Sequence, residues 1–350
     1  MKALLAHTPD ELRAEFASAG TPAFRAAQVA HWLYGRRVRD FAAMANLPAA
    51  LRSELAGSWR ARSLVLESEH RAADGTRKLV LATGDGAKIE AVIIPEARRQ
   101  TLCVSSQVGC SLDCTFCATG RMGLGRNLRA DEIVDQALHA AELLAADGKS
   151  LTHVVFMGMG EPLLNLKSVV QAIRILTHPD AFGLSPRRIT VSTAGVAPKI
   201  AELGQAVPVR LAISLHAAHD ELRDVLVPIN RKYPVQDLVT AAQAYAGKTG
   251  RRVSYEWVML AGVNDSARDA HELGALLKGK LAHVNLIPFN PVEDTPYHAP
   301  DRASIRAFRD RIEAQGLNVT VRDTRGREAD AACGQLHERI TRAKQPVEAR

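Results

Sequence analysis

The hydrophobic positions of the first 57 residues recur with the spacing of helices. A capping box at residues 8–11, with proline in the first helical turn, predicts a helix that ends near residue 19. Residues 24–34 show the same spacing up to a glycine, and residues 43–55, interrupted at Pro48, predict further helical turns. The chain therefore begins with a predicted helical unit.

The pattern changes from helical to alternating between residues 60 and 97. Strand-like segments cover residues 63–67, 77–82 and 88–94, and the first two are separated by a turn signal at residues 73–75. Short alternating strands joined by tight turns pair antiparallel. We expect a small antiparallel β unit that bridges the helical unit and the rest of the chain.

From Thr101 onward, strand-length apolar runs alternate with amphipathic helical stretches. This order predicts a parallel sheet, and the number of strands suits a full or partial (β/α) barrel. A doubly wound sheet is the alternative, but no Gly-x-Gly-x-x-Gly follows the first strand. The expected strands are 102–105, 152–157, 188–192, 210–214, 253–259, 283–287 and 319–322, and the expected helices include 130–146, 166–176, 235–245 and 305–314.

The predicted fold class is α/β, a partial (β/α) barrel with an N-terminal helical domain and a small antiparallel β extension. Its domains are expected at residues 1–57, 58–98 and 99–340, with a tail at 341–350. A chain of 350 residues with 47% hydrophobic and 24% charged residues is long enough and apolar enough for this arrangement.

Charge and cysteine content narrow the function. A net charge of +7 favours a polyanionic partner. Five cysteines, an odd number with three in one short loop, do not resemble a secreted disulfide framework. The first residues lack the apolar run of a signal peptide, and no segment is apolar enough to cross a bilayer. We expect a cytoplasmic protein without membrane contact, acting as a monomer.

Cys110, Cys114 and Cys117 form Cys-x3-Cys-x2-Cys directly after the first predicted barrel strand. Loops after barrel strands form the catalytic face, and three thiolates on one loop can converge on one metal centre. Structural zinc sites and ordinary iron–sulfur clusters take four protein ligands, so three suggest a centre with one open position. The alternative is a zinc loop completed by Cys103.

The cysteine loop, including Phe116 before its last cysteine, resembles that of the radical S-adenosylmethionine (SAM) superfamily. The resemblance implies that Cys110, Cys114 and Cys117 bind three irons of a [4Fe–4S] cluster and that the fourth iron binds SAM. Residues 158–162, Gly-Met-Gly-Glu-Pro, resemble the SAM-binding motif of this superfamily. By the same resemblance, the SAM-contacting residues are Gly160, Glu161, Ser192, Ser214, Leu215, His216 and Asn290.

Residues 24–34, 110–128 and 330–336 narrow the resemblance to the RlmN/Cfr adenine methyltransferases. This implies a barrel of the radical SAM type, an RNA-binding N-terminal domain and two SAM molecules per turnover. The implied substrates are an adenine of the peptidyl-transferase centre in 23S rRNA and the adenine 3′ of the anticodon in tRNA. A reductant protein is implied as electron donor. The implied product carries a methyl group on adenine C2.

The resemblance also gives roles to residues outside the cluster loop. Cys333 matches the cysteine that becomes S-methylcysteine, Cys103 matches the resolving cysteine that forms a transient disulfide with it, and Glu90 matches the proton acceptor. Without the resemblance, Glu90 is expected to be a solvated strand-edge carboxylate, and Cys103 and Cys333 to be small buried thiols.

Several basic groups can meet RNA phosphates, although charge alone also fits a solvated surface. Three function hypotheses compete with C2 methylation: the sister C8 methyltransferase, a non-catalytic zinc RNA-binding protein, and a glycyl-radical activase, which gives no role to Cys103 and Cys333. The basic groups are Arg25, His31, Arg36, Arg37 and Arg39 in the helical unit, the pairs Arg187-Arg188, Arg231-Lys232 and Arg251-Arg252, and Arg322, Arg325 and Arg327.

Overall fold

A ten-stranded sheet organises the protein, whose computed structural model describes residues 1–322, 325–326, 329–332 and 334–336. Its strand order is β14-β13-β12-β11-β10-β9-β6-β5-β4-β3. The strands are β3 (Leu64–Arg71), β4 (Arg77–Thr83), β5 (Lys88–Pro95), β6 (Gln100–Cys103), β9 (His153–Phe156), β10 (Ile189–Thr193), β11 (Arg210–Ser214), β12 (Val253–Met259), β13 (Ala282–Pro288) and β14 (Asn318–Val321).

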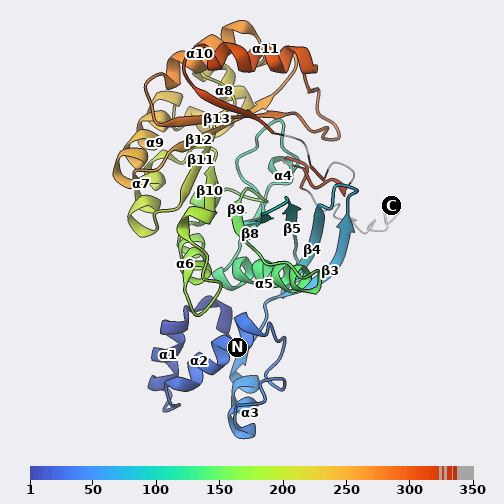
Figure 1. Ribbon diagram of the computed structural model, residues 1–350, viewed down its shortest axis with the longest axis vertical. Helices are drawn as coiled ribbons and strands as arrows, with labels where there is room; N and C mark the ends of the chain where they lie inside the picture. Colours follow the sequence, from blue (N-terminus) through green and yellow to red (C-terminus); the bar gives the residue numbers. More distant parts are fainter. Residues whose placement is uncertain (323–324, 327–328, 333, 337–350) are drawn as a thin grey trace, which may run out of the picture.

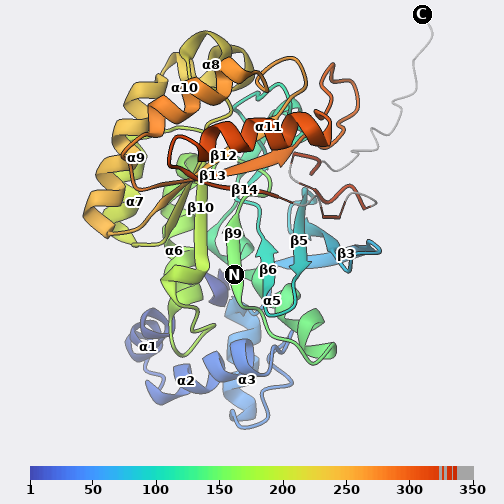
Figure 2. The same ribbon diagram turned by 45° about the horizontal axis from the view of Figure 1, so that its top comes forward.

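The strands from β6 to β14 are parallel and form the predicted partial barrel. Its helices lie along the outer side of the curved sheet (Figures 1 and 2). These helices are α5 (Ala130–Ala146), α6 (Leu166–Thr177), α7 (Ala197–Ala206), α8 (Asp220–Leu226), α9 (Val235–Thr249), α10 (Ala267–Leu277) and α11 (Arg302–Glu313), with short 3-10 turns η3 (Pro162–Asn165), η4 (Pro186–Arg188) and η5 (Pro228–Arg231).

Alternate residues of the barrel strands meet two different environments. In β12, Trp257 points outward and packs against Phe308 of α11, with ring centroids 5.8 Å apart. Tyr255, on the same side, accepts a hydrogen bond from Gln243 of α9 at 3.0 Å. Glu256, between them, lines internal cavities instead. The apolar core therefore lies between sheet and helices, and the inside of the barrel is free for polar chemistry.

The antiparallel β unit is part of the same sheet rather than a separate bridge. β3, β4 and β5 pair antiparallel in sequence, and β5 then pairs antiparallel with β6, the first strand of the barrel. Val92 of β5 lies opposite Cys103 of β6. Since side chains alternate along a strand, Glu90 shares the sheet face of Val92 and Cys103.

The N-terminal helices form a unit at one end of the molecule (Figure 1). The predicted capping box is confirmed, because Thr8 Oγ1 accepts from the backbone N–H of Glu11 and Glu11 Oε2 accepts from that of Thr8. The unit contains β1 (Lys2–Ala3), η1 (Leu4–Ala6), α1 (Pro9–Ser18), α2 (Phe24–Ala30), which continues as the π-helical turn η2 (His31–Gly35), α3 (Ala49–Ser58) and β2 (Trp59–Arg60).

One helix prediction was partly wrong. Residues 43–47 form turns, and α3 begins only after Pro48, which is its N-cap residue. Proline disfavours helical conformation in the residue before it, so the helical spacing upstream of Pro48 does not become a helix. Among the described residues, no helix has both the length and the apolar character that a membrane span requires.

Candidate active site

A short hairpin that the sequence did not reveal holds the cysteine loop. Its strands, β7 (Gln107–Gly109) and β8 (Leu124–Asn127), flank the loop, which also contains the short helix α4 (Ala118–Arg121). The N–H of Cys110 donates to the carbonyl of Gly123 at 2.9 Å and closes the loop at its neck. Gly109 has φ +74°, and a Cβ there would lie 1.9 Å from the Gly123 oxygen. Glycine is therefore required at this neck.

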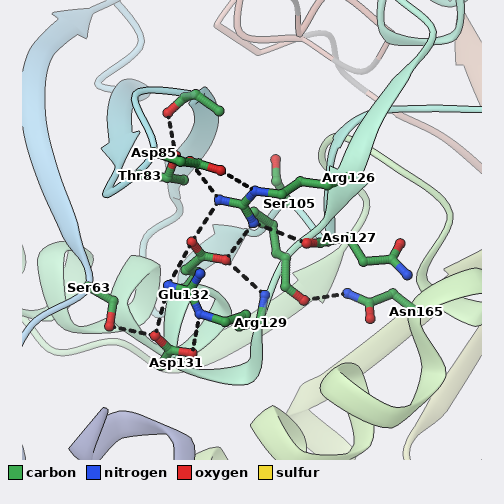
Figure 3. A network of polar contacts seen from close by, with 12 residues as sticks. Ser63, Thr83, Asp85, Ser105, Arg126, Asn127, Arg129, Asp131, Glu132 and Asn165 are labelled. Carbon is green, nitrogen blue, oxygen red and sulfur yellow. Dashed lines mark hydrogen bonds and ion pairs between the residues drawn. The ribbon is translucent and has the colours of Figure 1, made fainter. Parts of the chain in front are cut away.

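An ion-pair network fixes the hairpin to the barrel (Figure 3). Arg126 of β8 donates to both carboxylate oxygens of Asp85, at 2.7 and 2.9 Å, and to both of the buried Glu132 in α5, at 2.9 Å. The Asn165 amide donates to the carbonyls of Ser106 and Leu128 at 2.8 and 2.7 Å. Paired guanidinium–carboxylate contacts have defined geometry, so the loop projects from a rigid base.

The three loop cysteines line one cavity of about 170 Å³ at the C-terminal ends of the strands. Burial raises the pKa of Cys110 to about 12, and burial together with the neighbouring Cys117 and Cys110 raises the pKa of Cys114 well above its ordinary value. Cys110 and Cys114 therefore stay protonated unless a cation compensates the charge of their thiolates. The site therefore has the chemistry of a metal centre.

The spacing of the thiols distinguishes between metals. The Sγ atoms of the three described cysteines do not all lie within 4.8 Å of one another. Ligands of one tetrahedral zinc lie about 3.8 Å apart, because Zn–S bonds are about 2.3 Å long. Cys103, the proposed fourth zinc ligand, lines a different cavity. This arrangement argues against the zinc alternative and suits a cluster of several metal atoms.

Gly160 and Glu161 follow β9 and line the cysteine cavity. Gly160 has φ +96°, and a Cβ there would lie 2.5 Å from the Gln107 side chain, so glycine is required at this position. Glu161 accepts backbone N–H groups of Leu163 and Ala194 at 2.9 and 2.8 Å. Burial nevertheless raises its pKa to about 7. The carboxylate thus ties two strand ends together, and its remaining lone pairs are open to a ligand ammonium.

Ser192, Ser214 and His216 bring three more polar groups to the same cavity. The two serine oxygens lie 3.4 Å apart. His216 Nδ1 accepts the N–H of Val258 at 3.0 Å, and burial lowers its pKa to about 3. The neutral ring therefore carries its hydrogen on Nε2. It can donate one hydrogen bond to a ligand without bringing a positive charge.

Two predicted SAM contacts lie elsewhere. The Leu215 side chain is fully buried in the hydrophobic core, and this residue lines neither cavity described here, so only its backbone is available. Asn290 is buried and lines a second cavity rather than that of the cysteines. The resemblance to the radical SAM superfamily identified both residues, but it did not determine where their side chains point.

The second cavity, of about 970 Å³, holds Cys103. Met157, Glu256, Ile287 and Arg322 line both cavities and form the layer between them. Glu256 Oε2 lies 4.0 Å from Arg322 Nη1, and burial raises the pKa of this carboxyl group. The two cavities are therefore neighbours across a layer that contains one acidic and one basic side chain.

Glu90 is buried, which corrects the expectation of a solvated strand edge. Its side chain is 2% exposed and Oε1 lies 3.2 Å from Nζ of Lys78, which is also buried. The expectation failed because β5 is an internal strand, between β4 and β6. The carboxylate faces the side of the sheet that carries Cys103.

Cys333 lies outside the described residues, as do Arg327 and the tail at 341–350. Its described neighbours connect both cavities: Ala331 and Ala332 line the cavity of Cys103, and Gly334 lines that of the three cysteines. The Gly334 carbonyl accepts the N–H of Ala118 at 2.8 Å. The described residues before position 333 thus line the second cavity, and Gly334 contacts the cluster loop.

Sequence reasoning missed Arg223, which is fully buried behind the cysteine cavity. Its guanidinium donates to the carbonyls of Leu215 at 2.9 Å, Ala194 at 2.5 Å and Ser214 at 3.0 Å. It also donates to Asn230 Oδ1 at 2.8 Å. In sequence it looks like an ordinary arginine of an exposed helix, so no local signal distinguishes it. Glu256 did carry one, a lone charge within an apolar strand.

Comparison with known proteins gives separate family matches for the barrel and for the N-terminal helical unit. Residues 104–273 match the radical SAM superfamily, and residues 2–60 match the ribosomal RNA large subunit methyltransferase N-terminal domain. The dual-specificity RNA methyltransferase RlmN of Alkalilimnicola ehrlichii is 48% identical over 93% of this chain and 91% of its own length. The chain belongs to the RlmN family.

Two further comparisons are consistent with this assignment. A probable dual-specificity RNA methyltransferase RlmN of Thermus thermophilus is 45% identical over 98% of this chain and 95% of its own length. The crystal structure of a radical SAM methyltransferase from Sphaerobacter thermophilus matches with a TM-score of 0.94 and 45% identity, over 96% of this chain and 99% of that one. The protein is a radical SAM enzyme with a [4Fe–4S] cluster and SAM as cofactors.

Proposed function

We propose that this RlmN-family enzyme methylates C2 of one adenine in 23S rRNA and of the adenine 3′ of the anticodon in tRNA. The observation that carries the proposal is the pair of neighbouring cavities, one lined by three cysteines and the other by Cys103, with residues on both sides of position 333 lining them. The names of the RlmN relatives supply the substrate class.

Residues of the first cavity would hold the cofactors. Cys110, Cys114 and Cys117 bind the cluster, and the backbone at Gly160 with the polar groups of Glu161, Ser192, Ser214 and His216 binds SAM. Leu215 would contribute its backbone, and Asn290 would reach SAM from the second cavity. When bound, the two cofactors supply a carbon radical that can remove hydrogen from a methyl group. The buried walls keep water away from this chemistry.

Cysteine chemistry explains how a methyl group reaches an electron-poor ring carbon. Cys333 carries the methyl group and delivers its carbon to adenine. Attack of the Cys103 thiolate on the Cys333 sulfur then forms a disulfide and breaks the carbon–sulfur bond, and the product carbon keeps the electron pair and takes up a proton. Glu90, on the sheet face of Cys103, accepts the proton lost from the ring before this attack, and the electron left on the adduct would pass to the iron–sulfur cluster. Its burial supports this role over that of a solvated carboxylate.

The remaining parts of the proposal concern partners. A reductant protein supplies electrons to the cluster, and the enzyme acts as a monomer in the cytoplasm, where ribosomal RNA and tRNA are available. Phe24, 57% exposed, lies beside Arg25, whose guanidinium is 4.7 Å from its ring centroid, and this pair supports RNA binding by the N-terminal unit.

Mass spectrometry of RNA from cells with and without the protein tests the function. We expect 2-methyladenosine in 23S rRNA and tRNA with the wild type, and its absence with Cys333→Ala and Cys103→Ala. Finding 8-methyladenosine alone would make this the sister activity. A protein that purifies anaerobically with stoichiometric zinc and without iron would exclude radical methylation altogether.

A further inference from the structure

Four arginines lie at the N-terminal ends of three neighbouring barrel strands, opposite the cysteine loop. Arg187 lies in η4 just before β10, Arg210 is the first residue of β11, and Arg251 and Arg252 directly precede β12. Because these strands are parallel, their first residues meet at one edge of the sheet. All four line the second cavity, and Arg187, Arg210 and Arg252 are exposed. We call these four residues the mouth arginines.

The mouth arginines carry charge that the described part of the chain does not neutralise. Among the described residues, the lining of the second cavity contains seven arginines and two carboxylates. Both carboxylates are engaged, Glu96 with Arg99 at 3.0 Å and Glu256 beside Arg322 at 4.0 Å. No guanidinium of a mouth arginine forms a hydrogen bond or ion pair with a described residue, and the Nε of Arg251 is buried without a partner.

Two histidines in the same cavity have lowered pKa values, to which this positive charge contributes after burial. Burial, followed by repulsion from Arg99, Arg188 and Arg210, lowers the pKa of His153. Burial, followed by repulsion from Arg252, lowers that of His283, although a hydrogen bond with Asn285 opposes the shift. The histidines are therefore neutral, and the charge of the mouth comes from guanidinium groups that remain ionised at any working pH.

The cavity behind the mouth connects this charge to the proposed chemistry. It extends to Cys103, and its volume of about 970 Å³ is in the upper range of small-ligand pockets, enough for a nucleoside. Neighbouring strands lie about 4.8 Å apart, so the starts of β10 to β12 span about 10 Å, more than one phosphate group needs. We infer that the mouth arginines bind the RNA backbone on either side of the flipped adenosine, so that RNA enters from the end of the barrel opposite SAM.

This inference rests on the proposed function and adds the path of the substrate. An acidic reductant protein is the competing occupant of a basic surface. The position of the mouth favours RNA, because the layer of Met157, Glu256 and Arg322 separates this cavity from that of the cluster cysteines. An electron donor must approach the cluster, whereas a target base must approach Cys103.

The test compares two variants with the same loss of charge. The mouth variant is R187A/R210A/R251A/R252A. The control variant is R268A/R302A/R306A/R311A, which removes four exposed arginines from α10 and α11. These helices lie on the outer side of the sheet, where Phe308 of α11 meets the outward-facing Trp257. Fluorescence anisotropy of a labelled RNA hairpin with the target adenosine in its loop measures affinity at several salt concentrations.

We expect the mouth variant to bind the hairpin on the order of tenfold or more weakly. The slope of log K against log salt should become shallower by about 0.7 for each phosphate that the variant no longer neutralises, or about 3 in all. The control variant should keep the wild-type slope. Replacing the mouth arginines with lysine should restore most of the slope, and unchanged iron content and SAM binding in the mouth variant would show that it is folded.

Other outcomes overturn the inference. A mouth variant that binds RNA like the control, or that loses only reduction by a protein donor, excludes the mouth as the RNA site. The two proposals fail differently. If the wild type binds the hairpin through the mouth but forms no methyladenosine, the proposed function is wrong; if the mouth variant methylates RNA like the wild type, the inference is wrong.

Discussion

The two ends of this barrel are chemically opposite although the same strands build both. At the C-terminal end, a cavity of about 170 Å³ collects three thiols, the buried Glu161 and a neutral His216. At the N-terminal end, a cavity of about 970 Å³ opens among exposed arginines. One end suppresses charge by burial, and the other concentrates it where solvent can reach.

This difference shows how one sheet can separate two tasks. Radical chemistry requires that water be excluded, and a buried thiol-lined cavity meets that requirement once metal compensates the thiolates. Recognition of a polyanion requires uncompensated positive charge at the surface. Glu256 and Arg322 lie at the boundary between these environments. Substitutions in the two regions and between them should therefore change different measured properties: iron content, methylation or stability.

The largest effect is expected at the thiol end. Cys114→Ser should abolish iron binding and RNA methylation together, because two cysteines cannot retain the cluster. Iron per chain and methyladenosine in RNA measure the two effects. Cys103→Ala is the matched control: it should keep iron and lose methylation, since its thiol lines the other cavity. Equal iron loss in both variants would contradict the separation of the two cavities.

On the sheet face of Cys103, Glu90→Gln should lower the methylation rate by about 10²- to 10⁴-fold, the range typical for loss of a general base. Iron content and SAM binding should not change, because Glu90 lies on the sheet face of Cys103 and does not line the cysteine cavity. Glu67→Gln is the control, a half-exposed carboxylate 3.0 Å from Lys88. Similar rates for both variants would remove Glu90 from the mechanism.

Arg223 holds together the backbone at the C-terminal ends of neighbouring strands, so Arg223→Met should lower the free energy of unfolding. This substitution removes the donors to three strand-end carbonyls, and each buried acceptor left without a partner costs about 1–3 kcal/mol, so unfolding free energy should fall by about 3 kcal/mol or more. Urea unfolding measures the change. Arg268→Met, at an exposed position with a side chain 80% accessible, should stay within about 0.5 kcal/mol. Equal urea midpoints for Arg223→Met and Arg268→Met would show that the hydrogen bonds of Arg223 do not stabilise the fold.

The smallest effect is expected at the rim of the cysteine loop. The Arg126 guanidinium and the Thr83 hydroxyl lower the pKa of Asp85 below its ordinary value. The folded state therefore gains stability above the ordinary carboxyl pKa and loses it as pH falls through the lowered one. Because Asp85 is 54% exposed, Asp85→Asn should cost at most about 1 kcal/mol at pH 7.

Urea midpoints of wild type and Asp85→Asn at pH 7 and in acid test the sign of this effect. The difference should shrink in acid and at high salt, because protonation and screening both weaken the pair. A difference that grows as pH falls would contradict the assigned pKa direction.

The local pattern of the sequence was sufficient for most elements and for the cysteine loop. Residues 210–214 and 253–259 were predicted as strands, and β11 and β12 have those bounds. The capping box at Thr8 was confirmed by its hydrogen bonds. Residue spacing and short-range contacts determine such features, since they depend on neighbours a few positions away. The same spacing allowed Pro48 to be placed within a helical stretch that it instead delimits.

The tertiary structure alone decided which side chains share a cavity. Glu90 is buried because β5 is an internal strand, Leu215 points into the core, and Asn290 and Cys103 line a cavity separate from that of the cluster cysteines. Arg223 and the mouth arginines look alike in sequence, yet one is fully buried and most of the others are exposed. The period of a strand determines which residues share its face. Strand order and the meeting of distant strand ends are non-local, and they determine which side chains are buried, how their pKa values shift, and why the two ends of the barrel differ in charge.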